Sequence, residues 1–493
     1  MDSFPILTAL FLMTAATWLI SFRRRKSLPP GPTPLPIFGN MLQLGSKPYE
    51  TFAELSKQYG SLMSIQLGSV YTVVVSSPEM AKEILLKHAE VFSSRNKVQA
   101  LEECDHNQNS MGFLPMGDKW RDMRKISTEH IYSRQSMERS QELRKEKLQQ
   151  LLDHAQKCFE EGRALDFTEA SFITSTNVMS AILYSKQDTE FDSTATKEFR
   201  ETVYIAGTVH GLPNYADYFP ILRPFDPQGV KRLAKVYLGR VLGQMEGHLR
   251  ERIQIKNQNP NGPKKNDFVE MVVDSLQAKD NKLTLESYTH LMMDLYTGAS
   301  VMNTGGMERI MKELISHPDK MAKLKAELKS VMGDEKVVDD SKMSKLPYLQ
   351  AVVKEAMRFY PPIVLVNRQA ESDLVVNGYL IPKGTRVLIN LWGMGRDSNI
   401  WDNPLLFEPE RFLDQKIDFK GQDYKLIPFG SGKRICPAMS FSSWVMHTLP
   451  ATLIHNFNWK LEPQDASDKE AKGMWNGLPT GMAPPLKIVP YKE

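Results

Sequence analysis

The sequence predicts a mainly α-helical protein with a smaller β-rich region, preceded by one membrane-spanning helix at the N-terminus. Long stretches up to about residue 360 space their apolar residues as amphipathic helices do. Short alternating stretches at about 45–75 and after about 370 predict strands instead. With 41% hydrophobic and 24% charged residues, the composition is that of a globular protein with a large core.

The first predicted element is the uncharged run from Ser3 to Phe22, which is about as long as a bilayer core requires. Asp2 precedes this run and four basic residues, 23–26, follow it. A cleaved signal peptide would carry its positive charge before the apolar run, so an anchor is favoured, with a buried core helix as the alternative. The positive-inside rule then places the N-terminus in the lumen and the rest of the chain in the cytosol. We therefore predict residues 1–22 to be a single-pass transmembrane anchor.

The second element is the proline-rich segment from Leu28 to Asn40. Five of the eight residues 29–36 are proline, which excludes a helix and favours a stiff, extended spacer. We predict that residues 23–40 are a basic and proline-rich tether. Residues 41–493 then form the main domain, which the tether holds close to the membrane.

Charge and cysteine content exclude several classes of protein. The formal net charge is only +4, and no basic stripe interleaved with aromatic residues is present, so no nucleic-acid partner is expected. The three cysteines lie far apart, which argues against a disulfide framework and for a reducing compartment. Histidines occur singly, without HExxH or CxxC spacing, so a zinc enzyme is not predicted.

The strongest chemical signal is the segment from Phe429 to Pro437. Its two glycines permit a tight turn that brings the backbone close to a flat ligand. Pro437 suits the first position of a helix, so Cys436 is expected at a helix start, where backbone N–H groups stabilise a thiolate. Arg434 is placed to pair with an anionic group. From these residues alone, a metal-bound thiolate, a catalytic nucleophile and an inert buried cysteine all stay open.

This segment resembles the FxxGxRxCxG motif of the cytochrome P450 family, specifically its plant microsomal type. The matching residues are Phe429, Gly432, Arg434 and Cys436, while Ala438 replaces the last glycine. The resemblance covers essentially the whole chain, including the anchor and the PPGPxPxPxxGN tether. It implies the cytochrome P450 fold, with residues 41–493 as a haem-thiolate catalytic domain. It also implies haem b as cofactor, with its iron bound by the Cys436 thiolate.

Further motifs at the family's spacing imply roles around the haem. By this resemblance, the haem propionates are held by Trp120, Arg124 and Arg368. Glu355 and Arg358 are three residues apart and share a helix face, which alone is typical of a surface pair. The resemblance implies that they form a buried structural triad with Arg411.

The family's central helix carries an acid followed by a threonine, which together deliver protons during oxygen activation. In this chain Val301 and Met302 occupy those two positions, and neither side chain can relay a proton. A register shifted by two residues would offer Asn303 and Thr304 instead, but it requires a helix bulge. We take Thr304 and Ser300 as the candidate catalytic residues.

Within the family, the chain is most similar to plant terpenoid oxidases, which implies a large apolar substrate such as an abietane-type diterpene. The residues expected to line its pocket are apolar: Ala299, Val301, Met302, Ile363, Val364, Leu365 and Val366. The alternating stretch at 363–366 is equally compatible with an ordinary buried strand.

The expected activity is hydroxylation or further oxidation of the terpenoid with O2. No flavin or dinucleotide motif occurs, so electrons are expected from a separate NADPH-cytochrome P450 reductase. The expected location is the endoplasmic reticulum membrane, with the catalytic domain facing the cytosol. Because Val301 and Met302 replace the acid–threonine pair, two alternatives stay open: non-oxygenating rearrangement chemistry, and a catalytically impaired membrane scaffold.

Overall fold

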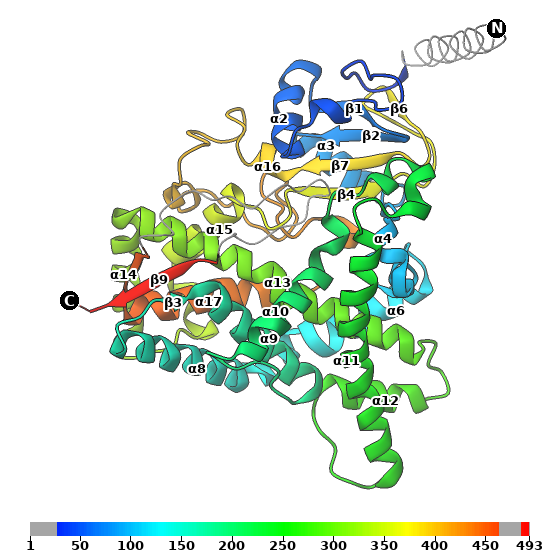
Figure 1. Ribbon diagram of the computed structural model, residues 1–493. Helices are drawn as coiled ribbons and strands as arrows, with labels where there is room; N and C mark the ends of the chain where they lie inside the picture. Colours follow the sequence, from blue (N-terminus) through cyan, green and yellow to red (C-terminus); the bar gives the residue numbers. More distant parts are fainter. Residues whose placement is uncertain (1–26, 463–484, 493) are drawn as a thin grey trace, which may run out of the picture.

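The computed structural model describes residues 27–462 and 485–492, so the predicted anchor at 1–22 lies outside the described residues. Among the helices that are described, none is both long and apolar enough to cross a membrane. Figure 1 shows a sheet with α2, α3 and α16 at one end of the molecule and the long helices filling the rest. The prediction of a mainly helical protein with a smaller β-rich part is confirmed.

The α-helices account for most of the chain. Their bounds are α2 Pro48–Tyr59, α3 Pro78–Lys82, α4 Gln99–Glu102, α5 His106–Asn109, α6 Asp118–Ser127, α7 Arg134–Arg139, α8 Gln141–Glu160, α9 Phe167–Tyr184, α10 Thr194–Thr208, α11 Val230–Gln258, α12 Phe268–Gln277, α13 Leu285–Ser316, α14 Pro318–Met332, α15 Pro347–Phe359, α16 Leu391–Met394 and α17 Met439–Asn456. Short 3-10 and π turns connect them: η2 Met41–Gln43, η3 Glu83–Lys87, η4 Glu103–Asp105, η5 Thr128–Tyr132, η6 Val209–Gly211, η7 Tyr215–Asp217, η8 Pro220–Phe225, η9 Asp340–Lys345, η10 Pro409–Phe412 and η11 Gly432–Arg434.

Helix α13 runs through the centre of the helical region and packs against α9, α10, α11, α15 and α17. The Thr284 side chain caps its N-terminus by accepting a hydrogen bond from the Ser287 N–H, and Pro318 begins the next helix directly after its end. Most of its side chains are buried on every side, as expected of a core helix. Gly306 has a packing role, because a Cβ there would lie 2.6 Å from the Met446 Cε of α17.

The β-structure consists of small sheets. Their strands are β1 Leu62–Leu67, β2 Val70–Val75, β3 Leu165–Asp166, β4 Leu365–Gln369, β5 Leu374–Val376, β6 Tyr379–Ile381, β7 Arg386–Asn390, β8 Asn458–Leu461 and β9 Lys487–Tyr491. The largest sheet has the order β1-β2-β7-β4, in which only the β2–β7 pair is parallel. The other two sheets have the orders β3-β9-β8 and β5-β6.

The antiparallel pair predicted near residues 45–75 is present as β1 and β2. The first part of that prediction is wrong, because residues 48–59 form helix α2. Pro48 occupies the first turn of this helix, and Tyr49 and Phe52 bury one face of it, a helical spacing that the strand interpretation overlooked.

Candidate functional site

The structure contains a cavity of about 1300 Å³, including its open mouth, between α13, α6, strand β4 and the loop that precedes α17. Cys436 lines this cavity. So do Leu295, Gly298, Met302 and Asn303 of α13. A cavity lined by one cysteine and by a mostly apolar helix can hold a flat apolar ligand.

The loop that carries Cys436 is held by backbone contacts. Gly432 has a φ of +67°, and a Cβ there would lie 2.1 Å from the Leu85 carbonyl oxygen, so no other residue fits without a shift of the backbone. The Cys436 N–H donates to the Phe429 carbonyl oxygen at 2.9 Å. Together these contacts fix the direction of the thiol toward the cavity.

The expected position of Cys436 at a helix start is wrong by three residues. Helix α17 begins at Met439 with Ala438 as its N-cap, so Pro437 does not occupy the first helical position. Burial raises the pKa of the Cys436 thiol, while the Ala438 backbone N–H and the charges of Arg124 and Arg95 act in the opposite direction. Coordination to a metal ion would deprotonate this thiol.

Four arginines line one part of the same cavity: Arg95, Arg124, Arg368 and Arg434. Within the described residues, none of them forms an ion pair with a carboxylate. The buried Nε of Arg95 has no hydrogen-bond partner. Burial and the charges of Arg95 and Arg124 lower the pKa of Arg434 to about 9, and burial with the neighbouring Arg95 and Arg434 lowers the pKa of Arg368. Asp294 and Glu371 offset only part of this positive charge, and such a concentration of arginines without ion-pair partners favours an anionic ligand.

Haem b fits this set of residues. Its two propionates supply the missing negative charges, in a form that guanidinium groups bind well. Its iron takes a thiolate ligand, and Cys436 is the only cysteine among the described residues lining the cavity. Trp120 was expected to hold a propionate, but its indole N–H donates to the Met111 carbonyl oxygen at 3.1 Å. The ring of Trp120 instead stacks under the Arg434 guanidinium at 4.9 Å.

The sequence model of the cytochrome P450 family matches residues 29–485. This chain belongs to the cytochrome P450 family. It is 64% identical to sugiol synthase of Salvia miltiorrhiza and 63% identical to ferruginol synthase of Salvia fruticosa, in both cases over 493 residues and 100% of each chain. It is 42% identical to carnosic acid synthase of Rosmarinus officinalis over 507 residues, again covering 100% of each.

Family membership confirms the predicted resemblance and the P450 fold. It identifies the protein as a P450 monooxygenase, an oxidoreductase whose haem iron is bound by a cysteine thiolate. The long insertion-free match to ferruginol and sugiol synthases makes these enzymes close relatives of the chain.

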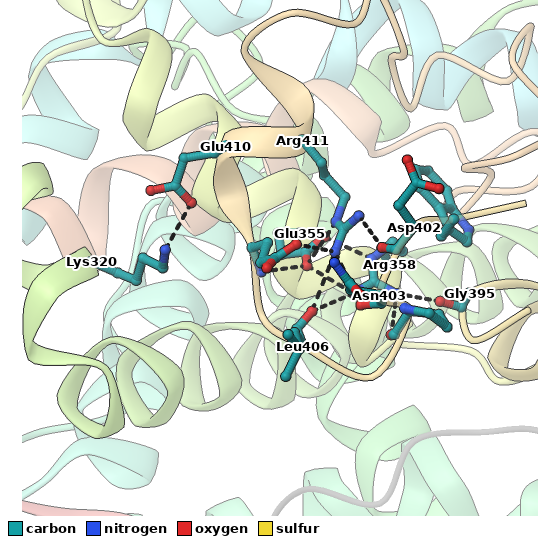
Figure 2. A network of polar contacts seen from close by, with 12 residues as sticks. Lys320, Glu355, Arg358, Gly395, Asp402, Asn403, Leu406, Glu410 and Arg411 are labelled. Carbon is teal, nitrogen blue, oxygen red and sulfur yellow. Dashed lines mark hydrogen bonds and ion pairs between the residues drawn. The ribbon is translucent and has the colours of Figure 1, made fainter. Parts of the chain in front are cut away.

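The P450 structure brings Glu355, Arg358 and Arg411 together as a buried triad (Figure 2). Arg358 donates from Nε to Glu355 Oε2 at 2.7 Å and from Nη2 to Oε1 at 2.8 Å, while Arg411 Nε lies 3.2 Å from the same Oε1. The guanidinium groups also bind loop carbonyls, those of Gly395 and Pro404 from Arg358 and that of Asp402 from Arg411. The triad therefore connects helix α15 to the loop segment at 395–411.

Helix α13 is continuous over the cavity, so the bulge required for a shifted register is absent from this described segment. Met302 and Asn303 line the cavity, whereas Ser300 and Thr304 do not. The hydroxyl groups of Ser300 and Thr304 donate to the carbonyl oxygens four residues earlier, Tyr296 and Ser300, both at 2.8 Å. A direct catalytic role for either hydroxyl remains a prediction, and it requires the hydroxyl to leave this bond.

Only part of the predicted apolar pocket faces the cavity. Met302, Ile363 and Val366 line it, but the lining residues do not include Ala299, Val301, Val364 or Leu365. Val301 points toward α10, where a Cβ on Gly207 would lie 3.3 Å from its Cγ2. Val364 and Leu365 pack into a separate cluster that includes Met63 and Leu388. In strand β4, Val366 and Arg368 face the cavity, two residues apart as strand geometry requires.

Three of the cavity residues that sequence reasoning missed in this P450 carry an ionisable side chain: Arg95, Tyr132 and Asp294. Arg95 and Tyr132 come from segments with no local motif that identifies them. Asp294 was detectable, because it is a charged residue inside the apolar run of the central helix. Its contacts are described below.

Proposed function

We propose that this protein is a membrane-anchored monooxygenase that hydroxylates or further oxidises an abietane-type diterpene. One observation carries the proposal: the same cavity contains the Cys436 thiol, four arginines without ion-pair partners and an apolar surface. This apolar surface, formed mainly by Leu295, Met302, Ile363 and Val366, is called the distal wall. The names of the relatives, sugiol synthase and ferruginol synthase, support a terpenoid substrate at an identity of 63–64%.

Haem b bound through Cys436 would supply the oxidising chemistry, because thiolate donation favours O–O cleavage. Arg95, Arg124, Arg368 and Arg434 would hold its propionates, with Phe429, Gly432 and Trp120 shaping the surrounding loop and helix. The Glu355 triad would keep the loop segment at 395–411 in place. These assignments rest on the contacts and charges described above.

The distal wall would orient the substrate. Met302, Ile363 and Val366 offer apolar surface that excludes water from the face of a hydrocarbon skeleton. The Asn303 amide donates to the Ala299 carbonyl oxygen at 2.8 Å, so its own carbonyl oxygen stays available to accept a hydrogen bond from a water molecule. We propose that Asn303 holds the water that the missing acid–threonine pair would otherwise position.

We further propose that residues 1–22 anchor the protein in the endoplasmic reticulum membrane, that residues 23–40 are the tether and that residues 41–493 are the cytosolic catalytic domain. A group of exposed apolar side chains supports membrane contact: Leu35, Ile37, Phe38, Leu42, Ile221 and Phe225. The two segments that carry them meet, since the rings of Phe38 and Phe219 lie 6.1 Å apart. Electrons would come from NADPH-cytochrome P450 reductase at the same membrane.

The test uses microsomes that contain the full-length chain and the reductase. The reduced protein with carbon monoxide should give the difference spectrum of a thiolate-bound haem, and abietane olefins should give oxygenated products that require NADPH. Cys436→Ser should abolish the spectrum, whereas Cys104→Ser, outside the cavity, should retain it. Absence of product from every terpene in a panel, despite a normal spectrum, would refute the proposal.

Rearrangement without oxygen is the second candidate function. One observation favours it: from Ser300 to Thr304, neither a carboxylate nor a hydroxyl side chain lines the cavity. This candidate predicts product formation without NADPH and under anaerobic conditions. A normal haem spectrum with no conversion under any condition would instead indicate a catalytically impaired scaffold.

A further inference from the structure

Asp294 places a carboxylate in the otherwise apolar distal wall of the cavity. It belongs to α13, where its cavity-lining neighbours are Leu295, Gly298 and Met302. Its side chain is 15% exposed, and this small exposed part opens into the cavity. A carboxylate in such surroundings is costly unless it is hydrogen-bonded.

The Asp294 carboxylate is held in place from one side. The Ser110 hydroxyl lies 2.8 Å from each of its two oxygens, the Gly112 N–H points to Oδ2 at 3.4 Å, and His106 Nε2 lies 3.4 Å from Oδ1. His106 is itself fixed by His290, because their Nδ1 atoms are 2.8 Å apart and their rings stack. Burial and the nearby His106 lower the pKa of His290 to about 4, so His290 is neutral at physiological pH. The contacts with Ser110, Gly112 and His106 therefore fix the direction of the Asp294 carboxylate.

These contacts leave the carboxylate with acceptor capacity. A carboxylate accepts about four hydrogen bonds. The single proton of the Ser110 hydroxyl reaches one oxygen at a time, and the Gly112 N–H is shared with Ser110 Oγ at 3.0 Å. At least one lone pair of Asp294 thus remains for a donor inside the cavity.

The charge around Asp294 favours a neutral donor over a cation. Arg95 lies on the same cavity, and the negative charge of Asp294 raises its pKa against the larger lowering effect of burial. The Arg95 guanidinium therefore already balances part of the negative charge, and it would repel a cationic group on a ligand in the same cavity.

We propose that Asp294, positioned by Ser110 and His106, is a specificity-determining residue that accepts a hydrogen bond from a hydroxyl group of the substrate. The preferred substrate is then an apolar polycyclic terpenoid that already carries one hydroxyl group, and an earlier hydroxylation must supply it. This inference rests on the proposed function and narrows its substrate class.

The first experiment compares three ligands with the same abietane skeleton: the hydrocarbon with an aromatic ring, its phenol and the methyl ether of that phenol. Each is titrated into the purified, haem-loaded full-length protein, and its Kd is measured from the change of the haem absorption spectrum. A hydrogen bond to a charged acceptor predicts a Kd for the phenol about tenfold lower than for the hydrocarbon and for the ether. Equal Kd values for the phenol and the ether would overturn the inference, because the ether keeps the oxygen and lacks only the donor.

The second experiment repeats the titrations with Asp294→Asn and with Glu286→Gln as the matched control. Glu286 lies in the first turn of the same helix, is exposed and does not line the cavity. Asp294→Asn should reduce the preference for the phenol to about threefold or less, since a neutral acceptor is weaker, and should leave the Kd of the hydrocarbon unchanged. An unchanged preference in this variant would overturn the inference.

The outcomes separate this inference from the proposed function. If the hydrocarbon binds and is oxidised with NADPH but the phenol shows no advantage, only the role of Asp294 is refuted. If none of the three ligands binds or reacts, the diterpene substrate itself is refuted.

Discussion

Replacement of Glu355 by glutamine tests how the P450 holds the loop segment at 395–411. Glu355 has no exposed side-chain surface and accepts hydrogen bonds from Arg358, from Arg411 and, at 2.7 Å, from the Glu408 N–H. Glu355→Gln keeps the shape of the side chain but leaves the fully buried Arg358 guanidinium without its counter-charge. Breaking a buried ion pair in this way costs about 3–5 kcal/mol. We therefore expect the free energy of unfolding to fall by this amount.

Glu410→Gln provides the matched control, because it removes a carboxylate from the same region (Figure 2). Glu410 is 34% exposed and pairs with Lys320 at 3.1 Å and Lys323 at 2.5 Å. Solvent screening limits the cost of losing such a pair to about 0–1 kcal/mol. The measurement is urea denaturation of the haem-loaded protein, in which tryptophan fluorescence and the carbon monoxide difference spectrum both report the fraction unfolded. Equal losses of stability in the two variants would refute the reasoning that burial of the triad decides its strength.

Three further predictions follow from the site. Gly432→Ala should abolish the carbon monoxide difference spectrum, because its Cβ would clash with the Leu85 carbonyl oxygen. Gly384 also has a positive φ, +81°, but open space around it. Gly384→Ala should therefore retain the spectrum and lower the free energy of unfolding in urea by only about 1–2 kcal/mol. Asn303→Ala should lower the product formed per NADPH oxidised about tenfold, and Thr289→Ala, on the same helix but outside the cavity, should change this ratio less than twofold. Burial lowers the pKa of His447 to about 4, so the unfolded chain binds a proton at this histidine at a higher pH than the folded protein does. The free energy of unfolding should therefore be highest above pH 6.5 and should fall as the pH is lowered toward 4, by about 1.4 kcal/mol per pKa unit. His447→Gln should flatten the pH dependence of urea denaturation between these two values.

The Cys436 side of the cavity was predictable from the sequence because short, contiguous motifs build it. The chain segment at 429–436 contains its own turn glycine, its own arginine and its own ligand, so local spacing specifies much of the geometry. Glu355 and Arg358 likewise meet because they are three residues apart on one helix. Even here the sequence did not determine where α17 begins, since the helix start depends on how Ala438 and the preceding loop pack.

The distal side was harder to predict because segments far apart in the chain build it. Asp294 meets Ser110 across 184 residues, a contact that no local pattern encodes. The side-chain directions at 363–366 depend on the pairing of β4 with β7, in which Val366 lies opposite Ile389. The four consecutive residues 363–366 were all expected to line the pocket, but successive side chains of a strand point to opposite faces, so Val366 lines the cavity and Leu365 does not.

The charges around the cavity connect the two proposals. Four arginines face it, and the two propionates of a bound haem would be their main partners, while Asp294 is the only carboxylate among the described residues that line the cavity. A cationic substrate would therefore meet the arginines and an anionic substrate would meet Asp294, and burial of a charge that lacks a partner is strongly unfavourable. A neutral substrate is therefore expected, and its one polar group should be a hydrogen-bond donor that Asp294 can satisfy.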